Sequence, residues 1–402
     1  MKILFVNCFY WPDLAGGAER SVKRLVDLHI KAGDEVSVLT THAGSDVKIE
    51  EIDGARVFRI PPNNIYWAKQ PDTPNSWKRL LWHSIDSFNP LSYRDALKVI
   101  REVTPDVVSC HNLAGLSASI WAATQKLKIP TVQVLRDYYT ICPKSTMNRN
   151  GHNCEKVCGS CAMFRVPHKI LANKLHAVVG CSQAVLNKHL RFGLYARVAV
   201  KEVIYNAESI SPKHKDSRDP NRAFTFGYIG ALTEVKGIDK MIQAFIEAEP
   251  HCNQPVRLIV AGTGPESYVN ELKRSFTAKN ISFIGHTKPA SLFEMSDITI
   301  APSIWDDPLP GVVFQALSHG VPVIGSNRGG IPEMVTDGYN GILYDPTNPF
   351  DLKNAMTRIA NDSNLHRWLT GNTIQSSEKF LDEDRLIKEY MSVYQRVTQN
   401  AT

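Results

Sequence analysis

The chain has 402 residues, of which 43% are hydrophobic and 21% charged, with a formal net charge of +6. This length exceeds one ordinary core and predicts two domains of about 150–200 residues each, and the composition excludes disordered and fibrous proteins. No run approaches the roughly 18 consecutive apolar residues of a membrane helix. The apolar run at residues 3–6 is too short for a signal peptide, so we expect a cytoplasmic protein.

The charge is unevenly distributed. Residues 1–210 hold 27 Lys and Arg against 18 Asp and Glu, whereas residues 211–402 hold 19 against 22. A basic first half suits an anionic partner, either a phospholipid surface at the inner face of the membrane or a pyrophosphate-linked acceptor. An ordinary soluble surface is the alternative. Nucleic acid is not expected, because no compact basic run with interleaved aromatic residues occurs.

Residues 63–90 are aromatic and basic. They contain Trp67, Trp77 and Trp82 together with Lys78 and Arg79. This combination suits a membrane interface, but an amphipathic helix that packs on the core explains it as well.

Short apolar runs alternate with amphipathic stretches along the first half. The predicted strands are residues 3–6, 36–40, 55–60, 107–110, 131–135 and 178–181. The alternation stops in a polar segment, 206–222, and resumes with strands at 224–229, 256–261, 281–284, 298–301 and 321–324. Strand–helix alternation with unbroken apolar strands predicts parallel sheets covered on both faces. We therefore expect two doubly wound, Rossmann-like domains facing a cleft, with ligands beyond the carboxyl ends of the strands.

The predicted domains follow from these limits. Residues 1–205 form an acceptor-binding domain with a Cys-rich insertion at 142–161, 206–222 a linker, and 223–380 a nucleotide-sugar-binding domain. Residues 381–402 form a last helix that we expect to cross back towards the first domain.

Several strand-to-helix turns carry residues suited to phosphate. Gly16 and Gly17 open a helix after the first strand, where free amides attract anions, although a plain tight turn also needs glycine. Lys236 precedes a helix after the strand at 224–229, where an ammonium group neutralises a diphosphate. The Gly-x-Gly at 262–264 lacks the third glycine of a dinucleotide site.

The segment 302–316 leads from a strand into another helix. The amides of Gly311 and Val312 are placed to hold a diphosphate, while Asp307 and Gln315 are placed to bind sugar hydroxyls. A further glycine turn follows at residues 325–333.

The ordered set of motifs resembles the retaining glycosyltransferases of family GT4, which have the GT-B fold. The set is Gly-Gly-Ala-Glu (16–19), Gly-Ala-Leu-x-x-x-Lys-Gly (230–237), Ala-Gly-x-Gly-Pro (261–265), Phe-Ile-Gly (283–285), Trp-x-Asp-Pro-Leu-Pro (305–310), Gly-Val-Pro-Val-Ile (320–324) and Gly-Gly-Ile-Pro-Glu (329–333). The resemblance spans residues 3 to about 345 and includes Tyr205-Asn206-Ala207 before the linker.

The resemblance implies a hexosyl transfer that retains the anomeric configuration and needs no metal or other cofactor for catalysis. It implies a UDP- or GDP-sugar as donor and a polysaccharide or lipid-linked glycan as acceptor. Lys236 would hold the donor diphosphate, Asp307 the donor sugar and Gln315 the ribose. The remaining donor positions would be Gly16, Gly17, Gly285, His286, Gly311, Val312 and Glu333.

The chain departs from the family pattern at several donor positions. Ala231 stands where the family usually has Arg, Pro310 replaces a glycine, and the glutamate pair is Asp307 and Gln315. Arg136 replaces the histidine of a His-Asp pair, and we hypothesise that its guanidinium supplies the phosphate charge lost at Ala231. The alternatives are a structural ion pair with Asp137 or a decayed donor site.

Those departures keep other functions open. The first is a donor-site-degenerate relative that binds carbohydrate or a partner without catalysis, and another is an enzyme with an unusual donor. His111 and Asn112 follow the strand at 107–110 and suit acceptor binding, although capping explains Asn112 equally well.

Four clustered cysteines, Cys142, Cys154, Cys158 and Cys161, suit a structural zinc site in a polar loop. Their irregular spacing is also compatible with free thiols or a redox-sensitive pair.

Overall fold

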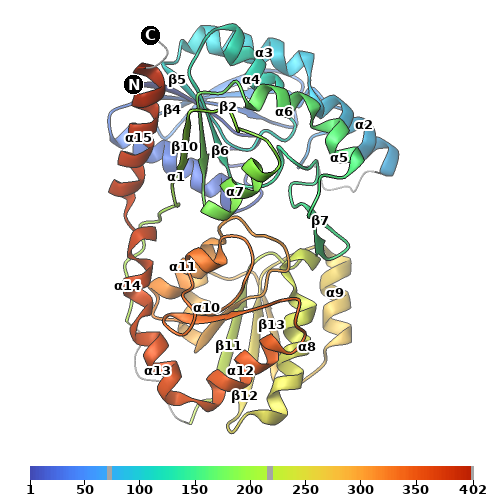
Figure 1. Cartoon of the computed structure of the whole chain (residues 1–402), viewed down its shortest axis with the longest axis vertical. Helices are drawn as coiled ribbons and strands as arrows, with labels where there is room; N and C mark the ends of the chain where they lie inside the picture. The colour runs from blue at the N-terminus through green and yellow to red at the C-terminus, as the bar shows by residue number, and fades with distance from the viewer. Residues whose placement is uncertain (70–74, 215–220, 400–402) are drawn as a thin grey trace. The chain divides into compact units, whose positions relative to one another are not determined.

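The computed structural model describes residues 1–69, 75–214 and 221–399. It divides into two compact units: one comprises Met1–Met147, Glu155–Asn206 and Glu383–Thr402, and the other Asn148–Cys154 and Ala207–Asp382. Residues 215–220 of the predicted linker and 400–402 of the predicted last helix lie outside the described residues. The elements of both units are labelled in Figure 1.

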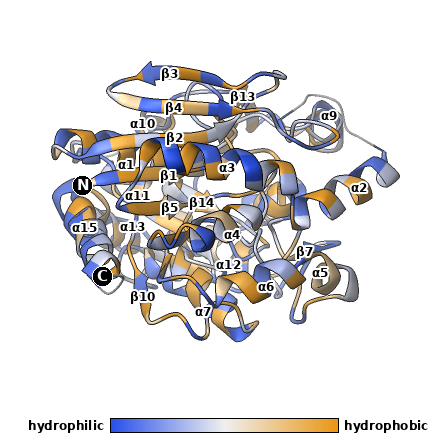
Figure 2. Ribbon diagram, turned by 90° about the horizontal axis from the view of Figure 1, so that it is seen from above, coloured by the Kyte–Doolittle hydropathy of each residue, from blue (hydrophilic) through white to orange (hydrophobic). Residues whose placement is uncertain are grey.

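The first unit contains an eight-stranded sheet in the order β10-β9-β6-β5-β1-β2-β4-β3. All neighbouring strands run parallel except β3, which is antiparallel to β4. The strands are β1 (Lys2–Val6), β2 (Glu35–Thr41), β3 (Lys48–Ile52), β4 (Ala55–Ile60), β5 (Val107–Cys110), β6 (Thr131–Leu135), β9 (Ala177–Gly180) and β10 (Val200–Val203). β1, β5, β6 and β9 are buried from their second residue onward, as expected for strands covered on both faces (Figure 2).

The helices of the first unit connect these strands. They are α1 (Gly17–Lys31), α2 (Ser76–Ser87), α3 (Pro90–Val103), α4 (Ser119–Lys126), α5 (Gly159–Phe164), α6 (Val166–Ala172), α7 (Gln183–Arg191) and α15 (Glu383–Gln399). α15 belongs to this unit because its buried Tyr394 donates a hydrogen bond to Ser109 of β5 at 2.8 Å and stacks on His29 of α1. The last helix of the sequence therefore completes the packing of the first sheet.

A buried polar cluster joins α2 to its neighbours. Asp86 of α2 is fully buried and accepts hydrogen bonds from the Tyr139 hydroxyl at 2.6 Å and the Gly115 amide at 2.7 Å. The Arg165 guanidinium, between α5 and α6, lies 3.9 Å from Asp86 and covers the Tyr139 ring. Burial outweighs these favourable contacts and raises the pKa of Asp86 to about 7.

The second unit is built around a six-stranded parallel sheet in the order β13-β12-β11-β14-β15-β16. Its strands are β11 (Phe224–Ile229), β12 (Val256–Ala261), β13 (Ile281–Gly285), β14 (Ile298–Ala301), β15 (Val323–Ser326) and β16 (Gly341–Tyr344). Its helices are α8 (Ile238–Ala248), α9 (Glu266–Ser275), α10 (Pro289–Met295), α11 (Gly311–Ser318), α12 (Asp351–Asn361), α13 (Ser363–Gly371) and α14 (Thr373–Ser377), with short 3-10 turns at Glu234–Lys236, Glu249–His251, Ile331–Glu333 and Glu378–Phe380.

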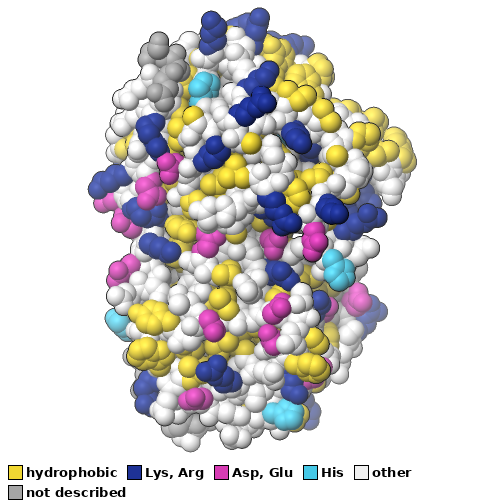
Figure 3. Space-filling model, in the orientation of Figure 1, with side chains coloured by type: hydrophobic (Ala, Val, Ile, Leu, Met, Phe, Trp, Pro, Cys, Tyr) yellow, Lys and Arg dark blue, Asp and Glu magenta, His cyan; other side chains and the backbone are white. Residues whose placement is uncertain are grey.

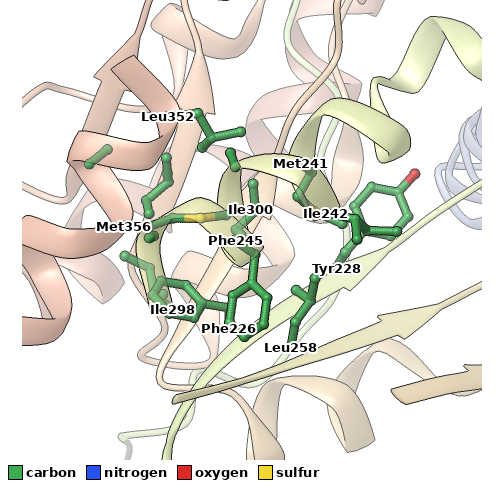
Figure 4. Close-up of a cluster of buried hydrophobic side chains, with 14 of the residues drawn as sticks. Phe226, Tyr228, Met241, Ile242, Phe245, Leu258, Ile298, Ile300, Leu352 and Met356 are labelled. Carbon is green, nitrogen blue, oxygen red and sulfur yellow. The ribbon is translucent and has the colours of Figure 1, made fainter. Parts of the chain in front are cut away.

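The core of the second unit lies between this sheet and the helices α8 and α12. Phe226, Phe245 and Met356 are fully buried there together with Ile298 and Leu258 (Figure 4). This apolar layer fixes the carboxyl ends of β11 and β14, from which the site described below is built.

A short hairpin, β7 (Asn148–Arg149) and β8 (His152–Asn153), also belongs to the second unit. The sequence placed it within the Cys-rich insertion of the first domain, and the structure corrects this assignment. The physical reason is a polar contact, because the Asn153 amide donates to the carbonyl of Ile304 at 3.2 Å and to the carboxylate of Asp306 at 3.1 Å. Among the described residues, no helix is both long and apolar enough to span a bilayer.

We predict that Asp86 makes the stability of the protein depend on pH. Because its pKa is about 7 in the folded state and 3.8 in the reference state, the folded protein binds more protons between these values. The free energy of unfolding should therefore fall from pH 4 to pH 7, on the order of 3 kcal/mol from this group. Urea unfolding of Asp86→Asn should lack this fall, while the exposed control Asp46→Asn should keep it; an unchanged profile in Asp86→Asn would contradict the assignment.

Candidate functional site

The candidate site of the second unit begins at the turn after β11. Lys236 ends the 3-10 turn Glu234–Lys236, and Gly237 links this turn to α8 with a left-handed φ of 69°. A Cβ at Gly237 would stand 2.4 Å from the carbonyl oxygen of Pro302, so only glycine lets the two loops approach. The Ile304 amide donates to the Val235 carbonyl at 3.0 Å and closes the contact. The turn that carries Lys236 is thus fixed against the loop after β14.

The loop after β14 carries the acidic partner. Asp307 is buried, with 6% of its surface exposed, and its carboxylate forms an ion pair with the Lys236 ammonium group. The Ser303 hydroxyl lies 3.4 Å from the same carboxylate oxygen, and Trp305 places its ring 5.7 Å from the Lys236 nitrogen. The structure therefore brings together Lys236 and Asp307, the two residues to which the resemblance assigned diphosphate and sugar.

The glycine turn at 329–333 supports the Asp307 loop from the other side. Gly330 donates its amide to the Asp307 carbonyl at 2.8 Å, and the Ser326 hydroxyl donates to the Ser303 carbonyl at 2.7 Å. At Gly329, φ is 54° and a Cβ would stand 2.0 Å from the Asp307 carbonyl oxygen. This motif therefore positions the Asp307 backbone, and Glu333 lies half-buried in the 3-10 turn that follows.

Helix α11 starts directly after this loop. The Val313 amide donates to the Pro310 carbonyl at 3.1 Å, while Gly311 and Val312 at the start of the helix are half-buried, so their two amides are placed where an anion can bind. Gln315, one turn further, donates its side-chain amide to the Glu208 carboxylate at 2.8 Å. The sequence did not identify Glu208, although it follows the Tyr205-Asn206-Ala207 segment that carried part of the resemblance.

The Gly-x-Gly after β12 has a packing role. The Gly262 amide donates to the Gly285 carbonyl at 2.7 Å, and the Leu232 amide donates to the Thr263 carbonyl at 2.8 Å. These bonds tie together the loops at the carboxyl ends of β11, β12 and β13. Gly285 and His286 themselves are exposed, so their backbone is accessible to a ligand.

The first unit gathers a second group of predicted residues at the ends of β5 and β6. Arg136 donates from Nε to His111 Nδ1 at 3.1 Å and from a terminal nitrogen to the Asn206 side chain at 2.8 Å. The Asn112 amide donates to the Asp137 carboxylate at 3.1 Å. One alternative from the sequence was that Arg136 forms a structural ion pair with Asp137. The structure corrects it, because Arg136 contacts His111 and Asn206 instead.

His111 is 2% exposed, and burial lowers its pKa well below the usual value, with the Arg136 charge adding to the effect. Its Nδ1 accepts from Arg136 and its Nε2 lies 3.2 Å from the Ser109 hydroxyl. A neutral, enclosed imidazole orients Arg136, so the predicted direct contact of His111 with an acceptor is not supported. Asn112 is half-buried, and its side-chain oxygen accepts from the Ala114 amide at 3.1 Å, which forms an Asx turn and no helix cap, since α4 begins only at Ser119.

Gly16 and Gly17 begin α1 of the first unit. Glu19 accepts a hydrogen bond from the Gly16 amide at 2.7 Å, which is one half of a capping box, since glycine has no side chain for the reciprocal bond. A Cβ at Gly17 would meet no described atom within 4 Å. Packing therefore does not require glycine at position 17. That the protein backbone at Gly17 comes close to a ligand, such as a phosphate, remains a prediction.

The cysteine cluster does not assemble the predicted zinc site. The sulfur atoms of Cys142 and Cys161 lie 3.8 Å apart, and a hydrogen bond from Cys161 lowers the pKa of Cys142 to about 6. Cys158 also contacts Cys161, whereas Cys154 belongs to the second unit. Within the described ranges, no group of three or more His, Cys, Asp or Glu side chains is arranged to hold a metal ion. A tetrahedral site needs four converging ligands, so the four-thiol prediction is not supported.

Substitution at Gly329 should test the support of Asp307. Gly329→Ala should lower the free energy of unfolding by more than the roughly 1–2 kcal/mol of left-handed strain, because its Cβ also meets the Asp307 backbone. Gly338→Ala is the matched control, since Gly338 has a φ of 71° and open space around its Cβ. Urea unfolding of both variants measures the difference, and equal losses would contradict the proposed support.

The Gln315–Glu208 contact gives a second prediction. Gln315→Glu should destabilise the protein by about 1–3 kcal/mol, because two acceptors then face each other. Adding Glu208→Gln should restore most of the loss by reversing donor and acceptor. A double-mutant cycle from chemical denaturation measures this coupling, and additive effects of the two changes would show that the contact contributes nothing.

Comparison with known proteins identifies the family of this chain. Residues 15–207 match the family described as Glycosyltransferase Family 4, and residues 209–375 match Glycosyl transferases group 1. A 42.6 kDa protein of the cps region of Klebsiella pneumoniae is 30% identical over 336 residues, which cover 83% of this chain and 87% of that protein. A glycogen synthase of Mycobacterium tuberculosis is 24% identical over 90% of this chain and 86% of its own.

Solved structures share the fold. The sucrose-phosphate synthase of Thermosynechococcus elongatus superposes with a TM-score of 0.76 at 16% identity over 99% of each chain. HepE of Anabaena, solved in complex with UDP, gives a TM-score of 0.69 at 21% identity over 98% of this chain and 99% of its own. At these identities the similarity shows a two-domain α/β fold with parallel sheets.

Proposed function

We propose a specific reaction for this chain, which belongs to the GT4-type glycosyltransferases: transfer of a hexosyl group from a nucleoside-diphosphate donor to a glycan or lipid-linked acceptor, with retention of the anomeric configuration. In this reaction the bond between the sugar C1 and the diphosphate oxygen breaks, and a bond from C1 to an acceptor hydroxyl oxygen forms. The hydroxyl proton leaves with the nucleoside diphosphate.

The observation that carries the proposal is the Lys236–Asp307 pair beside the first turn of α11. Lys236 has three donors, and its contact with Asp307 leaves donors for the diphosphate. The amides of Gly311 and Val312 add fixed dipoles where the leaving group gains charge, which is how an enzyme stabilises a developing anion. Asp307, an acceptor only when ionised, suits hydroxyl groups of the donor sugar.

Gln315 stands where the family has its second glutamate, but the Glu208 carboxylate lies next to it, which fits a donor site that still has a carboxylate at this place. Gln315 donates its amide hydrogen to Glu208, so its carbonyl oxygen stays available as an acceptor, and the Glu208 carboxylate lies beside it. We propose that this pair takes the place of the family's second glutamate and contacts the ribose. Arg136, held by His111 and Asn206, stays a predicted phosphate ligand.

The relatives support a nucleotide sugar as donor and a surface polysaccharide as product. HepE was solved with UDP and with UDP-glucose, and the Klebsiella relative lies in a cps region. We propose UDP- or GDP-sugars as the first donors to test. Catalysis without a metal is part of the same proposal, because Lys236 and the helix amides supply positive charge to the diphosphate.

A non-catalytic binder is the second candidate, and the exposed Ala231 favours it, because a methyl group stands where the family usually has a guanidinium. A panel of nucleotide sugars separates the two functions. A donor at 100 times its dissociation constant should stabilise either protein by about 2.7 kcal/mol, but only the enzyme should release nucleoside diphosphate.

Lys236→Ala should lower turnover by about 10²–10³-fold, as for removal of one charge-stabilising donor. It also leaves the buried Asp307 unpaired, so thermal unfolding must be measured alongside activity. Lys240→Ala, an exposed lysine on α8, is the matched control and should keep full activity. Unchanged nucleotide release by a folded Lys236→Ala would refute the diphosphate role.

A further inference from the structure

A group of exposed apolar side chains covers one side of the first unit, on the helices α2, α5 and α6. They are Trp77, Leu80, Leu81, Met163, Val166 and Ile170. Trp77 is 61% exposed and Met163 is 63% exposed, which is far above the exposure of core residues. Figure 3 shows hydrophobic side chains gathered over α2 and α5, at the upper right of the view. We call this set of six the α2–α5–α6 face.

The spacing of these residues shows that each helix has two distinct sides. Trp77, Leu80 and Leu81 lie three or four residues apart on α2, while Trp82 and Asp86 of the same helix are buried. Met163, Val166 and Ile170 follow the same spacing, and the intervening Phe164 and His168 are buried. The exposed apolar residues are therefore a second, outward stripe that the core does not use.

Buried contacts hold the three helices together beneath this stripe. The rings of His83 on α2 and Phe164 on α5 are 6.2 Å apart, and the Asp86–Arg165–Tyr139 cluster lies behind them. The Trp82 indole donates to the Tyr66 carbonyl at 3.0 Å. The face is thus presented on a fixed support rather than on an unstructured loop.

The charge around the face is mainly positive. Lys78, Arg79, Lys169 and Lys174 are exposed on or next to these helices. The sequence has one acidic residue in 75–94, the buried Asp86, and none in 156–176, although the exposed Glu155 directly precedes the second range. Lys78 places its ammonium group 5.9 Å from the Trp77 ring. An apolar surface bordered mainly by cations is complementary to an anionic one.

We propose that the α2–α5–α6 face docks onto the headgroup region of an anionic lipid bilayer. Trp and Leu side chains enter the interface while Lys and Arg contact lipid phosphates. A protein partner fits less well, because lysine is depleted in protein–protein interfaces. An exposed apolar patch of this kind on a soluble unit marks an interaction site. The proposal concerns a surface separate from the donor residues and goes beyond the sugar-transfer reaction.

The test is co-sedimentation of the full chain with vesicles of phosphatidylcholine alone or with 30% phosphatidylglycerol, a composition of roughly cellular anionic charge. The wild-type chain should bind the anionic vesicles and lose binding as salt increases. Lys78→Gln with Arg79→Gln should weaken binding about fivefold for each charge removed. Trp77→Ser with Leu81→Ser, and separately Met163→Ser with Ile170→Ser, should each weaken it at least tenfold.

Phe350→Ser is the matched control, since Phe350 is 61% exposed on the second unit, and it should bind vesicles as the wild type does. Thermal unfolding and stabilisation by a nucleotide sugar should stay unchanged in every variant, which separates failure here from failure of the transfer reaction. Absence of wild-type binding, equal binding to uncharged vesicles, or full binding by the serine variants would overturn the proposal. If the wild-type chain self-associates but does not bind vesicles, and Trp77→Ser abolishes the self-association, the face binds a second copy of the chain and the proposal is overturned.

Discussion

The ion pair between Lys236 and Asp307 is the interaction on which the second unit's site depends. The pair joins the turn after β11 to the loop after β14. Removal of either side chain would leave the charge of the other unpaired in a poorly solvated site. The surrounding backbone is arranged to keep the pair in place: the loops touch through Ile304 and Val235, and Gly330 holds the Asp307 carbonyl. A charge pair held in this way is already oriented before any ligand arrives, which lowers the reorganisation that catalysis requires.

Two departures from the family pattern, at Gln315 and Arg136, have defined contacts of their own in the structure. Replacing the second glutamate by Gln315 removes a charge, but Glu208 brings a carboxylate to within 2.8 Å of the amide. Replacing the histidine by Arg136 adds a charge, and a neutral His111 together with Asn206 orients it without a carboxylate partner. Both side chains contact residues distant in sequence. Comparing a motif position by position reveals which residue has changed but not the contacts that the new residue makes.

The sequence predicted the fold well where strands are buried and apolar. The runs at 3–6, 131–135 and 224–229 became β1, β6 and β11, since unbroken apolar segments are typical of parallel sheets. β3 (Lys48–Ile52) and β10 (Val200–Val203) were missed because charged residues interrupt their apolar residues at the two edges of the sheet. β16 (Gly341–Tyr344) was missed although it is as long as β5 and β14. The family resemblance singled out Lys236 and Asp307 separately but did not predict their ion pair. Glu208 and Asn153 act through contacts between residues more than 100 positions apart, which no local pattern encodes.

The hairpin formed by β7 and β8 has a consequence for how such chains diversify. The backbone passes from one unit to the other after Met147, Cys154, Asn206 and Asp382, so neither unit is one continuous stretch of sequence. Recombination at the 206–207 junction alone would transfer the second unit without Asn153, whose side chain contacts Ile304 and Asp306. The contacts that hold the loop at Ile304 and Asp306 therefore depend on a seven-residue segment, Asn148–Cys154, that is encoded within the first half of the chain.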